Sequence, residues 1–195
     1  MFRLQKPTAD EIGREVIAAS LPGMMSAEYL DECGGVCAVG LPNGFALDRL
    51  QSRIGKGKQT FERAIQAFKN WTQFDLGWTR VANSSARIEA GQIVAVEMRS
   101  LGLWSLNLSQ IVEVIQMESR FGFIYKTTQA HVEEGEERFE VMLDEKSGAV
   151  SYETEAVSRP RDLMALLGYP VTRAFQHRFG RDSHKRMLAA VGGWD

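Results

Sequence analysis

The sequence predicts an α+β fold in which helices precede and follow an antiparallel sheet. Apolar residues recur with the 3.6-residue period of a helix, most clearly from Phe61 to Trp71. From Trp78 to Ala156 the period changes to two, and short apolar runs alternate with turn residues. After Pro160 the helical period returns. Successive short strands with short connections favour an antiparallel meander, so the sheet should lie between the helices in the chain.

The N-terminal residues predict a helical lead-in to this sheet. Thr8 or Asp10 is placed to cap a helix, and Pro22-Gly23 breaks it. We therefore divide the chain into a helical lead-in, residues 1–34, and a single domain, residues 35–195. A length of 195 residues is enough for one domain with a sizeable core.

The clearest helix begins at Gln59 or Thr60, directly after a glycine-containing segment. One face is polar, so the helix packs by one side only, and its apolar face carries Phe61, Ala64, Ile65, Phe68 and Trp71. The preceding segment, residues 53–58, reads Arg-Ile-Gly-Lys-Gly-Lys. It lacks the spacing of a P-loop, so we interpret it as a glycine turn, with anion binding as the alternative.

The middle of the chain contains the runs that predict strands, separated by turn residues: 78–81, 93–98, 104–108, 111–117, 121–127, 139–143 and 150–156. Residues 144–148 carry a hairpin signal between the last two runs. The final helix begins after Pro160 with Asp162 as its cap, and Pro170 interrupts it or begins the next piece. The predicted order is helix, antiparallel sheet and long C-terminal helix.

The overall composition excludes several functional classes. The net charge of −2 gives no global electrostatic case for a nucleic-acid partner. No stretch approaches the roughly 18 apolar residues of a membrane-spanning helix, and the first residues do not resemble a secretory signal, so we expect a cytoplasmic protein. Cys33 and Cys37 are the only cysteines, which makes a zinc site poor and two reduced thiols the expected state. Nothing in the sequence indicates a cofactor.

Three motifs in the second half of the chain, with glycines and aromatics that extend back to residue 44, resemble a known family: Phe121-Gly122-Phe123-x-Tyr125-x-Thr127, His131-x3-Gly135-Glu136-Glu137-x-Phe139 and Ser158-Arg159-Pro160. In order and spacing they are similar to the family called domain of unknown function 1990, over roughly residues 35–190. The chain departs from the family at Lys126, where the family tends toward glycine, and at Ala130, where a small turn residue such as glycine is usual. The resemblance supplies no activity. It implies a fold similar to the helix-grip domains of the Bet v 1 and START-like group, in which a curved antiparallel sheet wraps around a long C-terminal helix. In that group a cavity between sheet and helix often holds an apolar ligand.

A dense polar segment between two apolar strands is the first candidate site, with His131, Glu133, Glu134, Glu136 and Glu137. If a strand covers residues 136–143, alternation places Glu137 on the more apolar face with Phe139, and Glu136 on the other. A buried carboxylate needs a partner, which His131 or Arg159 could supply. Three interpretations stay open: hydrogen bonds that fix a turn with Glu133 and Glu134 solvated, polar groups that anchor a ligand, and a metal or acid–base site.

Two further sets of residues bear on a ligand site. The guanidinium of Arg159 fits a carboxylate or a phosphate, with Glu136, Glu137 or an anionic ligand group as its partner. Aromatic residues of the sheet either fill a core or line a cavity. In residues 104–109 polar side chains alternate with apolar ones, so one face of that strand is either exposed to solvent or the polar wall of a pocket; the polar residues are Ser105, Asn107 and Ser109.

The leading hypothesis is a binding protein, non-enzymatic or weakly catalytic, for a small apolar or amphipathic molecule between the sheet and the C-terminal helix. The residues that we expect at the ligand are Trp104, Phe123, Tyr125, His131, Glu137 and Arg159. One alternative is an enzyme that uses His131 with Glu136 or Glu137. The other is a partner-binding module on the basic helix 173–186. No Ser/His/Asp arrangement or dinucleotide motif is present, so no catalytic residue and no metal ligand is assigned.

Overall fold

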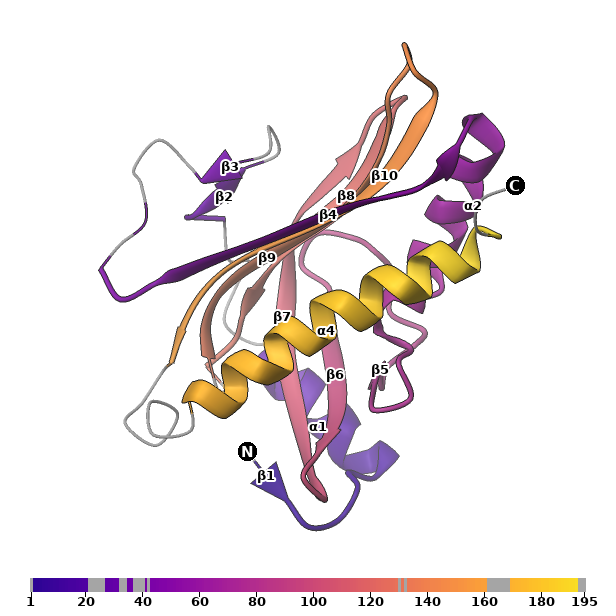
Figure 1. Ribbon diagram of the computed structural model, residues 1–195. Coiled ribbons are helices and arrows are strands. Elements are labelled where there is room, and N and C mark those ends of the chain that lie inside the picture. Colours follow the sequence, from indigo (N-terminus) through magenta and orange to yellow (C-terminus); the bar gives the residue numbers. More distant parts are fainter. Residues whose placement is uncertain are drawn as a thin grey trace.

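The structure is a computed structural model that describes residues 2–20, 27–31, 35–36, 41, 43–129, 131, 133–160 and 169–192. A curved antiparallel sheet holds a long helix against its concave face (Figure 1). The helices are α1 (Ala9–Ala19), α2 (Lys58–Lys69), the short 3-10 helix η1 (Thr72–Phe74) and α4 (Tyr169–Ala190). The strands are β1 (Phe2–Arg3), β2 (Leu30–Asp31), β3 (Gly35–Val36), β4 (Ala46–Lys56), β5 (Thr79–Val81), β6 (Ile93–Ser100), β7 (Leu103–Gln116), β8 (Arg120–Thr127), β9 (Glu133–Leu143) and β10 (Ala149–Pro160).

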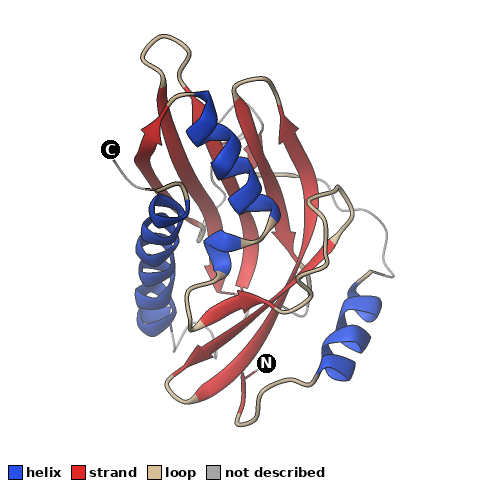
Figure 2. Ribbon diagram, turned by 90° about the vertical axis from the view of Figure 1, so that its right-hand side faces the viewer, coloured by secondary structure: helices blue, strands red, loops and turns tan. Residues whose placement is uncertain are grey.

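The strand order confirms the predicted fold class. The sheet runs β4-β10-β9-β8-β7-β6-β5, and every neighbouring pair is antiparallel. From β5 to β10 each strand pairs with the next one in sequence, as in a meander, and β4 adds to the free edge of β10. Helices α2 and α4 lie together on one side of this sheet (Figure 2). The protein is therefore an α+β, helix-grip-like fold with a curved antiparallel sheet around a long C-terminal helix.

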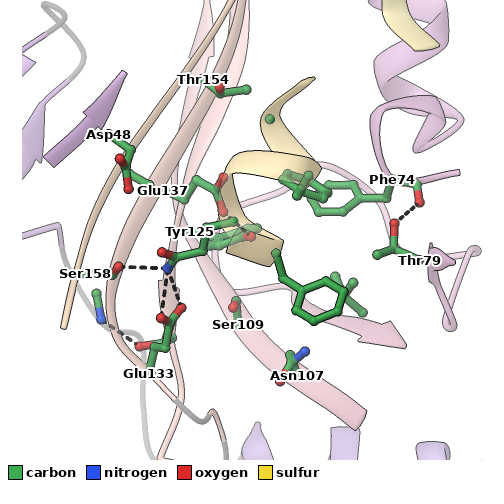
Figure 3. A pocket seen from close by; sticks show the side chains of 18 of the residues that line it. Asp48, Phe74, Thr79, Asn107, Ser109, Tyr125, Glu133, Glu137, Thr154 and Ser158 are labelled. Carbon is green, nitrogen blue, oxygen red and sulfur yellow. Dashed lines mark hydrogen bonds between the residues drawn. The ribbon is translucent and has the colours of Figure 1, made fainter. Parts of the chain in front are cut away.

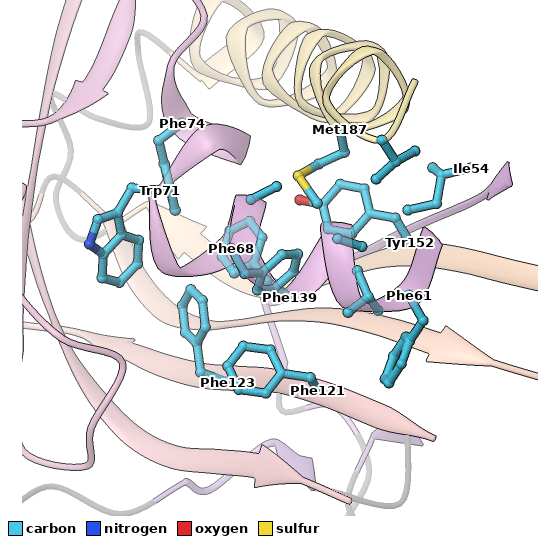
Figure 4. Packing of buried hydrophobic residues seen from close by; sticks show 14 of the residues in the cluster. Ile54, Phe61, Phe68, Trp71, Phe74, Phe121, Phe123, Phe139, Tyr152 and Met187 are labelled. Atoms are coloured by element: carbon cyan, nitrogen blue, oxygen red, sulfur yellow. The ribbon is translucent and has the colours of Figure 1, made fainter. Parts of the chain in front are cut away.

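The hydrophobic core fills the space between the sheet, α2 and the C-terminal half of α4 (Figure 4). Phe68 of α2 lies at its centre and contacts Phe121, Phe123 and Tyr152 edge-on, with ring centroids 5.7–6.1 Å apart. Such edge-to-face contacts add to the burial of apolar area. Met187, from the last turns of α4, is fully buried in the same cluster. Side chains therefore fill the interface between the sheet and the C-terminal half of α4, which we call the solid core.

The N-terminal segment packs on the convex side of the sheet. Thr8 caps α1, and Glu11 completes a capping box with it, as the sequence predicts for one of its two candidate caps. Ile12 packs against alternate residues of β6 and β7, which include Ile93 and Leu106, while Val94 faces the main core. β1 adds a short pairing with β7. Residues of the predicted lead-in thus contact the sheet directly, and the division at residue 34 stays a prediction.

Three elements differ from the sequence prediction. β4 was not predicted, because its apolar residues do not alternate regularly and it ends in the segment that we interpreted as a glycine turn. The runs 104–108 and 111–117 form the single strand β7, which passes through a bulge between Ile111 and Glu113. The residues Ser158-Arg159-Pro160 are the last three of β10 and do not form the first turn of a helix. The predicted cap Asp162 lies outside the described residues, as do Cys33 and Cys37.

Helix α2 begins where the sequence predicts a breaker. Its N-cap, Gly57, has φ of 85°, a left-handed conformation that favours glycine. The turn is closed by Thr60, whose hydroxyl donates to the carbonyl of Lys56 at 2.8 Å. Among the helices that the structure describes, none is long and apolar enough to cross a membrane.

Candidate functional site

A cavity of about 340 Å³ lies between the concave face of the sheet and the N-terminal half of α4 (Figure 3). Strands β4, β7, β8, β9 and β10 each contribute inward-facing residues, and α4 covers them with the segment 175–181. Apolar walls are formed by Phe74, Trp78, Phe175 and Phe179, together with Leu50 of the edge strand β4. The cavity thus continues the sheet–helix interface beyond the end of the solid core.

The cavity exists because the inward-facing side chains become smaller along the sheet. On β9 the large residues Val141 and Phe139 give way to Glu137 and then to Gly135. On β10 the fully buried Tyr152 is followed on the same face by smaller residues, namely Thr154, Ala156 and Ser158. Small side chains opposite a helix leave volume that no group of the protein fills.

The polar end of the cavity is built around Glu137. Its carboxylate accepts a hydrogen bond of 2.6 Å from the hydroxyl of Tyr125, its neighbour on β8. The pKa of Glu137 is raised to about 7: burial is the main cause, the Tyr125 hydrogen bond opposes it, and the nearby acids Glu133 and Asp48 add a smaller upward effect. Burial also raises the pKa of Tyr125 well above 10. Near neutral pH, the Glu137 carboxyl therefore exists in both protonation states.

Two further carboxylates of the cavity are held by α4. The amide of Gln176 donates to both oxygens of Glu133 at 2.8 Å and lies 3.2 Å from the hydroxyl of Ser158. Burial raises the pKa of Glu133 above its usual value. Arg173 reaches Asp48 of β4 through both of its terminal nitrogens, one of them at 2.7 Å. These contacts fix the N-terminal half of α4 over the cavity.

His131 lies in the loop before β9 and lines the cavity. Its Nδ1 accepts a 3.0 Å hydrogen bond from the backbone N–H of Glu133, so the neutral ring carries its proton on Nε2. The bond fixes the orientation of the ring at the start of β9. Within the described part of the chain, no group of three or more His, Cys, Asp or Glu side chains is arranged to hold a metal ion.

The structure brings three of the six predicted ligand residues together at the cavity, namely Tyr125, His131 and Glu137. Phe123 lies beside them in the solid core, with its ring stacked on Phe139 at 5.3 Å. Trp104 lies on the convex side near β1, with Lys6 and Arg99 over its ring.

Arg159, the sixth predicted residue, also lies away from the cavity. It pairs with Glu134 at 2.8 Å and packs over the ring of Phe45, and not with Glu136 or Glu137. Its partner could not be chosen from sequence, because Glu134 and Glu136 share one face of β9 and the pairing register with β10 decides between them. The register places Arg159 opposite Glu134.

The carboxylate of Glu136 is turned away from Glu137, as strand alternation predicts. It accepts hydrogen bonds from the backbone N–H groups of Glu28, Tyr29 and Leu30 at 2.7, 2.9 and 3.1 Å. These three bonds tie the chain before β2 to the convex face of the sheet. Glu136 therefore does not join His131 in a shared acid–base site. Glu133, which one interpretation placed in solvent, is buried instead.

Sequence reasoning left the polar face of β7 open between solvent and a pocket wall. Asn107 and Ser109 are both buried and both line the cavity, so this face is the wall of a pocket. Asp48 was missed because β4 was missed. Phe175 and Phe179 stand four residues apart, a spacing that marks one face of a helix and could have indicated the cover of the cavity.

Several members of the predicted basic surface on α4 have partners within the protein. Arg173 is paired with Asp48, Arg186 with Asp75 at 2.9 Å, and Arg178 with Asp182 at 3.3 Å. His184 is buried and points toward the sheet, where Ser52 and Thr154 contact its ring nitrogens at 2.5 and 3.3 Å. The positive charge available to a partner on this helix is thus smaller than the sequence suggests.

A family model described as "Domain of unknown function (DUF1990)" matches residues 30–186. The chain belongs to this family. A UPF0548 protein of Dictyostelium discoideum is 36% identical over 161 residues, which cover 77% of this chain and 74% of the relative. A UPF0548 protein of Arabidopsis thaliana is 28% identical over 155 residues, 76% of this chain and 75% of the relative. The family description names no activity, so function has to be argued from the cavity.

Solved structures also resemble the fold at low identity. The crystal structure of Ara h 8.0201 matches with a TM-score of 0.45 and 13% identity, over 75% of this chain and 99% of that one. The di-domain ARO/CYC BexL from the BE-7585A biosynthetic pathway matches with a TM-score of 0.49 and 15% identity, over 78% of this chain and 52% of that one. The assignment of the fold rests on the strand order and on α4.

Proposed function

We propose that the protein binds one small apolar or amphipathic molecule in the cavity under the N-terminal half of α4. The observation that supports this most is the cavity itself, with a volume of about 340 Å³ and largely apolar walls. Ligand pockets in proteins occupy roughly 300–1,000 Å³ and combine apolar walls with a few polar groups. Binding would remove apolar surface of both the ligand and the walls from water.

The ligand would lie with its apolar body between the aromatic walls and its polar part at Glu137. Phe74 and Phe179 are in contact, with ring centroids 5.4 Å apart, and Trp78 packs against Phe175 at 5.8 Å. These rings give a rigid apolar surface on the side of η1, β5 and α4. Tyr125, whose ring stacks with that of Phe74 at 6.4 Å, and its hydrogen-bond partner Glu137 lie on the sheet side, so one molecule can touch both the rings and the carboxyl.

Ala156 offers a direct test. It pairs with Asp48 of β4 and with Glu137 of β9, and it lines the cavity. The substitution Ala156→Phe places a ring inside the cavity, whereas Gln51→Phe adds the same ring at an exposed position of β4 that does not line it.

The measurement is the fluorescence of N-phenylnaphthylamine, a neutral apolar dye, titrated into each protein. We expect saturable binding with one site in the wild type and in Gln51→Phe, and at least about tenfold weaker binding in Ala156→Phe, the equivalent of about 1.4 kcal/mol. Circular dichroism and a melting curve check that each variant is folded. Absence of binding to the wild type, or equal binding to both variants, would refute the proposal.

A further inference from the structure

The charged groups that face the cavity differ between its interior and its rim. Three acids line the cavity, Glu133 and Glu137 on β9 and Asp48 on the edge strand β4, where its side chain is 28% exposed. Arg173 neutralises Asp48. The other two accept hydrogen bonds from neutral side chains, Glu133 from Gln176 and Glu137 from Tyr125, and within the described residues neither has an ion-pair partner. Among the described residues no cation forms an ion pair with these two carboxylates, although the charge of Arg173 acts on Glu133 from a distance and lowers its pKa.

The remaining basic groups lie at the edge. His177 and Arg181, both exposed, border the cavity from α4. Arg49 borders it from β4, but its guanidinium pairs with Glu153 at 2.9 Å on the convex face of the sheet. His131 holds its ring by accepting the N–H of Glu133. None of these groups gives the inner end of the cavity a positive charge.

A buried amide on β7, another strand of the same sheet, also favours a ligand that donates hydrogen bonds. Asn107 of β7 lines the cavity and is only 9% exposed, yet its Oδ1 accepts no hydrogen bond from the residues that the structure describes. Its Nδ2 lies 3.5 Å from the hydroxyl of Ser105. A buried acceptor without a donor costs roughly 1–3 kcal/mol, so a donor supplied by a ligand would be favourable there. Figure 3 shows Asn107 and Glu137 on different strands around the same space.

We propose that the natural ligand is a cationic amphiphile, an apolar or aromatic body that carries an ammonium group, and that this group binds at Glu137. An ammonium has three donors and no acceptor, which matches a cavity that presents unused acceptors. The aromatic walls add favourable contact with a cation. A carboxylate or phosphate at the same end would be repelled by Glu133 and Glu137. This inference rests on the proposed function, because it specifies the ligand of the same cavity.

Binding of an ammonium at Glu137 should depend on pH. Since the pKa of Glu137 is about 7 without a ligand, an ammonium that binds its carboxylate at lower pH must displace a proton to solvent. Affinity for an amine should then fall by up to about tenfold for each pH unit below 7. Affinity for an uncharged alcohol should not fall in this way. The pKa of the nearby, buried Glu133 is also raised. The dependence of amine affinity on pH therefore reports the titration of both acids together and not of Glu137 alone.

The experiment compares three ligands with the same alkyl chain, decylamine, decanol and decanoate, as competitors of bound N-phenylnaphthylamine at about pH 8 and about pH 6. We expect decylamine to bind at least about tenfold more tightly than decanol at the higher pH, and decanoate to be the weakest. The preference for decylamine over decanol should shrink at the lower pH. It should also shrink in Glu137→Gln, but persist in Glu134→Gln, which removes a carboxylate from the convex face of the same strand.

The outcomes separate the inference from the function on which it rests. If decanol or decanoate competes as well as decylamine at both values of pH, the cavity binds apolar molecules and the inference about the ammonium is wrong. If the dye binds but the preference survives in Glu137→Gln, the cation is bound elsewhere and the inference is again wrong. If neither the dye nor any competitor binds, the proposed function itself fails. The comparison of ligands in the wild type needs no variant to fold.

Discussion

Glu137 directs its carboxyl from β9 into the cavity, where the hydroxyl of Tyr125 is its hydrogen-bond donor at 2.6 Å. The desolvation of this carboxyl outweighs the hydrogen bond, so the pKa of Glu137 rises to about 7. The folded protein then binds a proton in a pH range where the unfolded chain does not. Glu137 therefore destabilises the fold at neutral pH. A loss of stability of this kind is typical of residues kept for binding or catalysis.

The sign of this effect gives a prediction. Between pH 4.5, the ordinary pKa of a glutamate, and pH about 7, the folded state holds the proton of Glu137 and the unfolded state releases it. Stability must fall as pH rises through this window, by on the order of 3 kcal/mol in total. Glu137→Gln cannot ionise. We expect it to match the wild type near the low end of the window and to exceed it in stability above pH 7.

Urea unfolding of both proteins at a series of pH values measures the difference. His184 acts in the opposite sense, because burial lowers its pKa from 6.5 to about 4, and stability is lost as pH falls through that range. Both proteins contain His184, so its contribution cancels in the comparison. A stability difference that stays constant with pH would show that Glu137 titrates normally.

Sequence alternation was sufficient to place some residues of the site and not others. Once β9 is assigned, the period of two places Glu137 inward and Glu136 outward, and the same rule places Tyr125 on the inner face of β8. The partner of a residue depends on the register between strands and on the position of a helix. For this reason Gln176, which binds Glu133, was not predicted.

At the scale of elements, β8 and β9 pass each other closely at Gly122. A Cβ at this position would lie 2.2 Å from the backbone oxygen of Phe139 and 2.9 Å from the Cα of Glu140. Backbone atoms cannot move aside as a flexible side chain can. The glycine thus lets two strands approach where the sheet curves around α4, a use that glycines in curved sheets commonly have.

We predict that Gly122→Ala destabilises the protein by about 1–3 kcal/mol, as overpacking does. The matched control is Gly13→Ala in the exposed part of α1, where a Cβ would meet nothing within 4 Å. Because alanine is the better helix former, the control should stabilise the protein by about 0.5–1 kcal/mol. Denaturant midpoints of the two variants give both values, and a neutral Gly122→Ala would contradict the close approach.

Long amphipathic or alternating elements were predictable, and irregular ones were not. The apolar stripe of α2 and the runs of β6, β8, β9 and β10 all correspond to predicted elements. β4 was not predicted because its inward face combines Leu50 with the polar residues Asp48 and Ser52, while Leu47 is exposed on the other face, and this removes the apolar alternation. Its polar inner face makes sense only when α4 lies above it, since Asp48 meets Arg173 and Ser52 meets His184 there.

At the scale of the whole molecule, the interface between sheet and helix has two parts. Toward the C-terminal end of α4 it is closed by aromatic residues from α2 and the sheet (Figure 4). Toward the N-terminal end it is hollow and partly polar (Figure 3). Polar contacts hold α4 along both parts, from Gln176 on Glu133 to Ser183 on the hydroxyl of Tyr152. The packed core thus holds the sheet and α4 together next to the cavity, which is the arrangement expected of a preformed ligand site. The helix-grip order of elements was predictable from sequence, but the volume of the interface was not, because it depends on how side chains from seven strands meet α4.

We propose that a small molecule occupies the hollow part of the interface between sheet and helix. Native mass spectrometry of the wild type and of Ala156→Phe, each incubated with decanol and with decylamine, tests it most directly. We predict one adduct per wild-type chain that disappears on denaturation, and little or none on Ala156→Phe, because the added ring occupies the cavity. Adducts of equal intensity on both proteins, or on neither, would contradict the account.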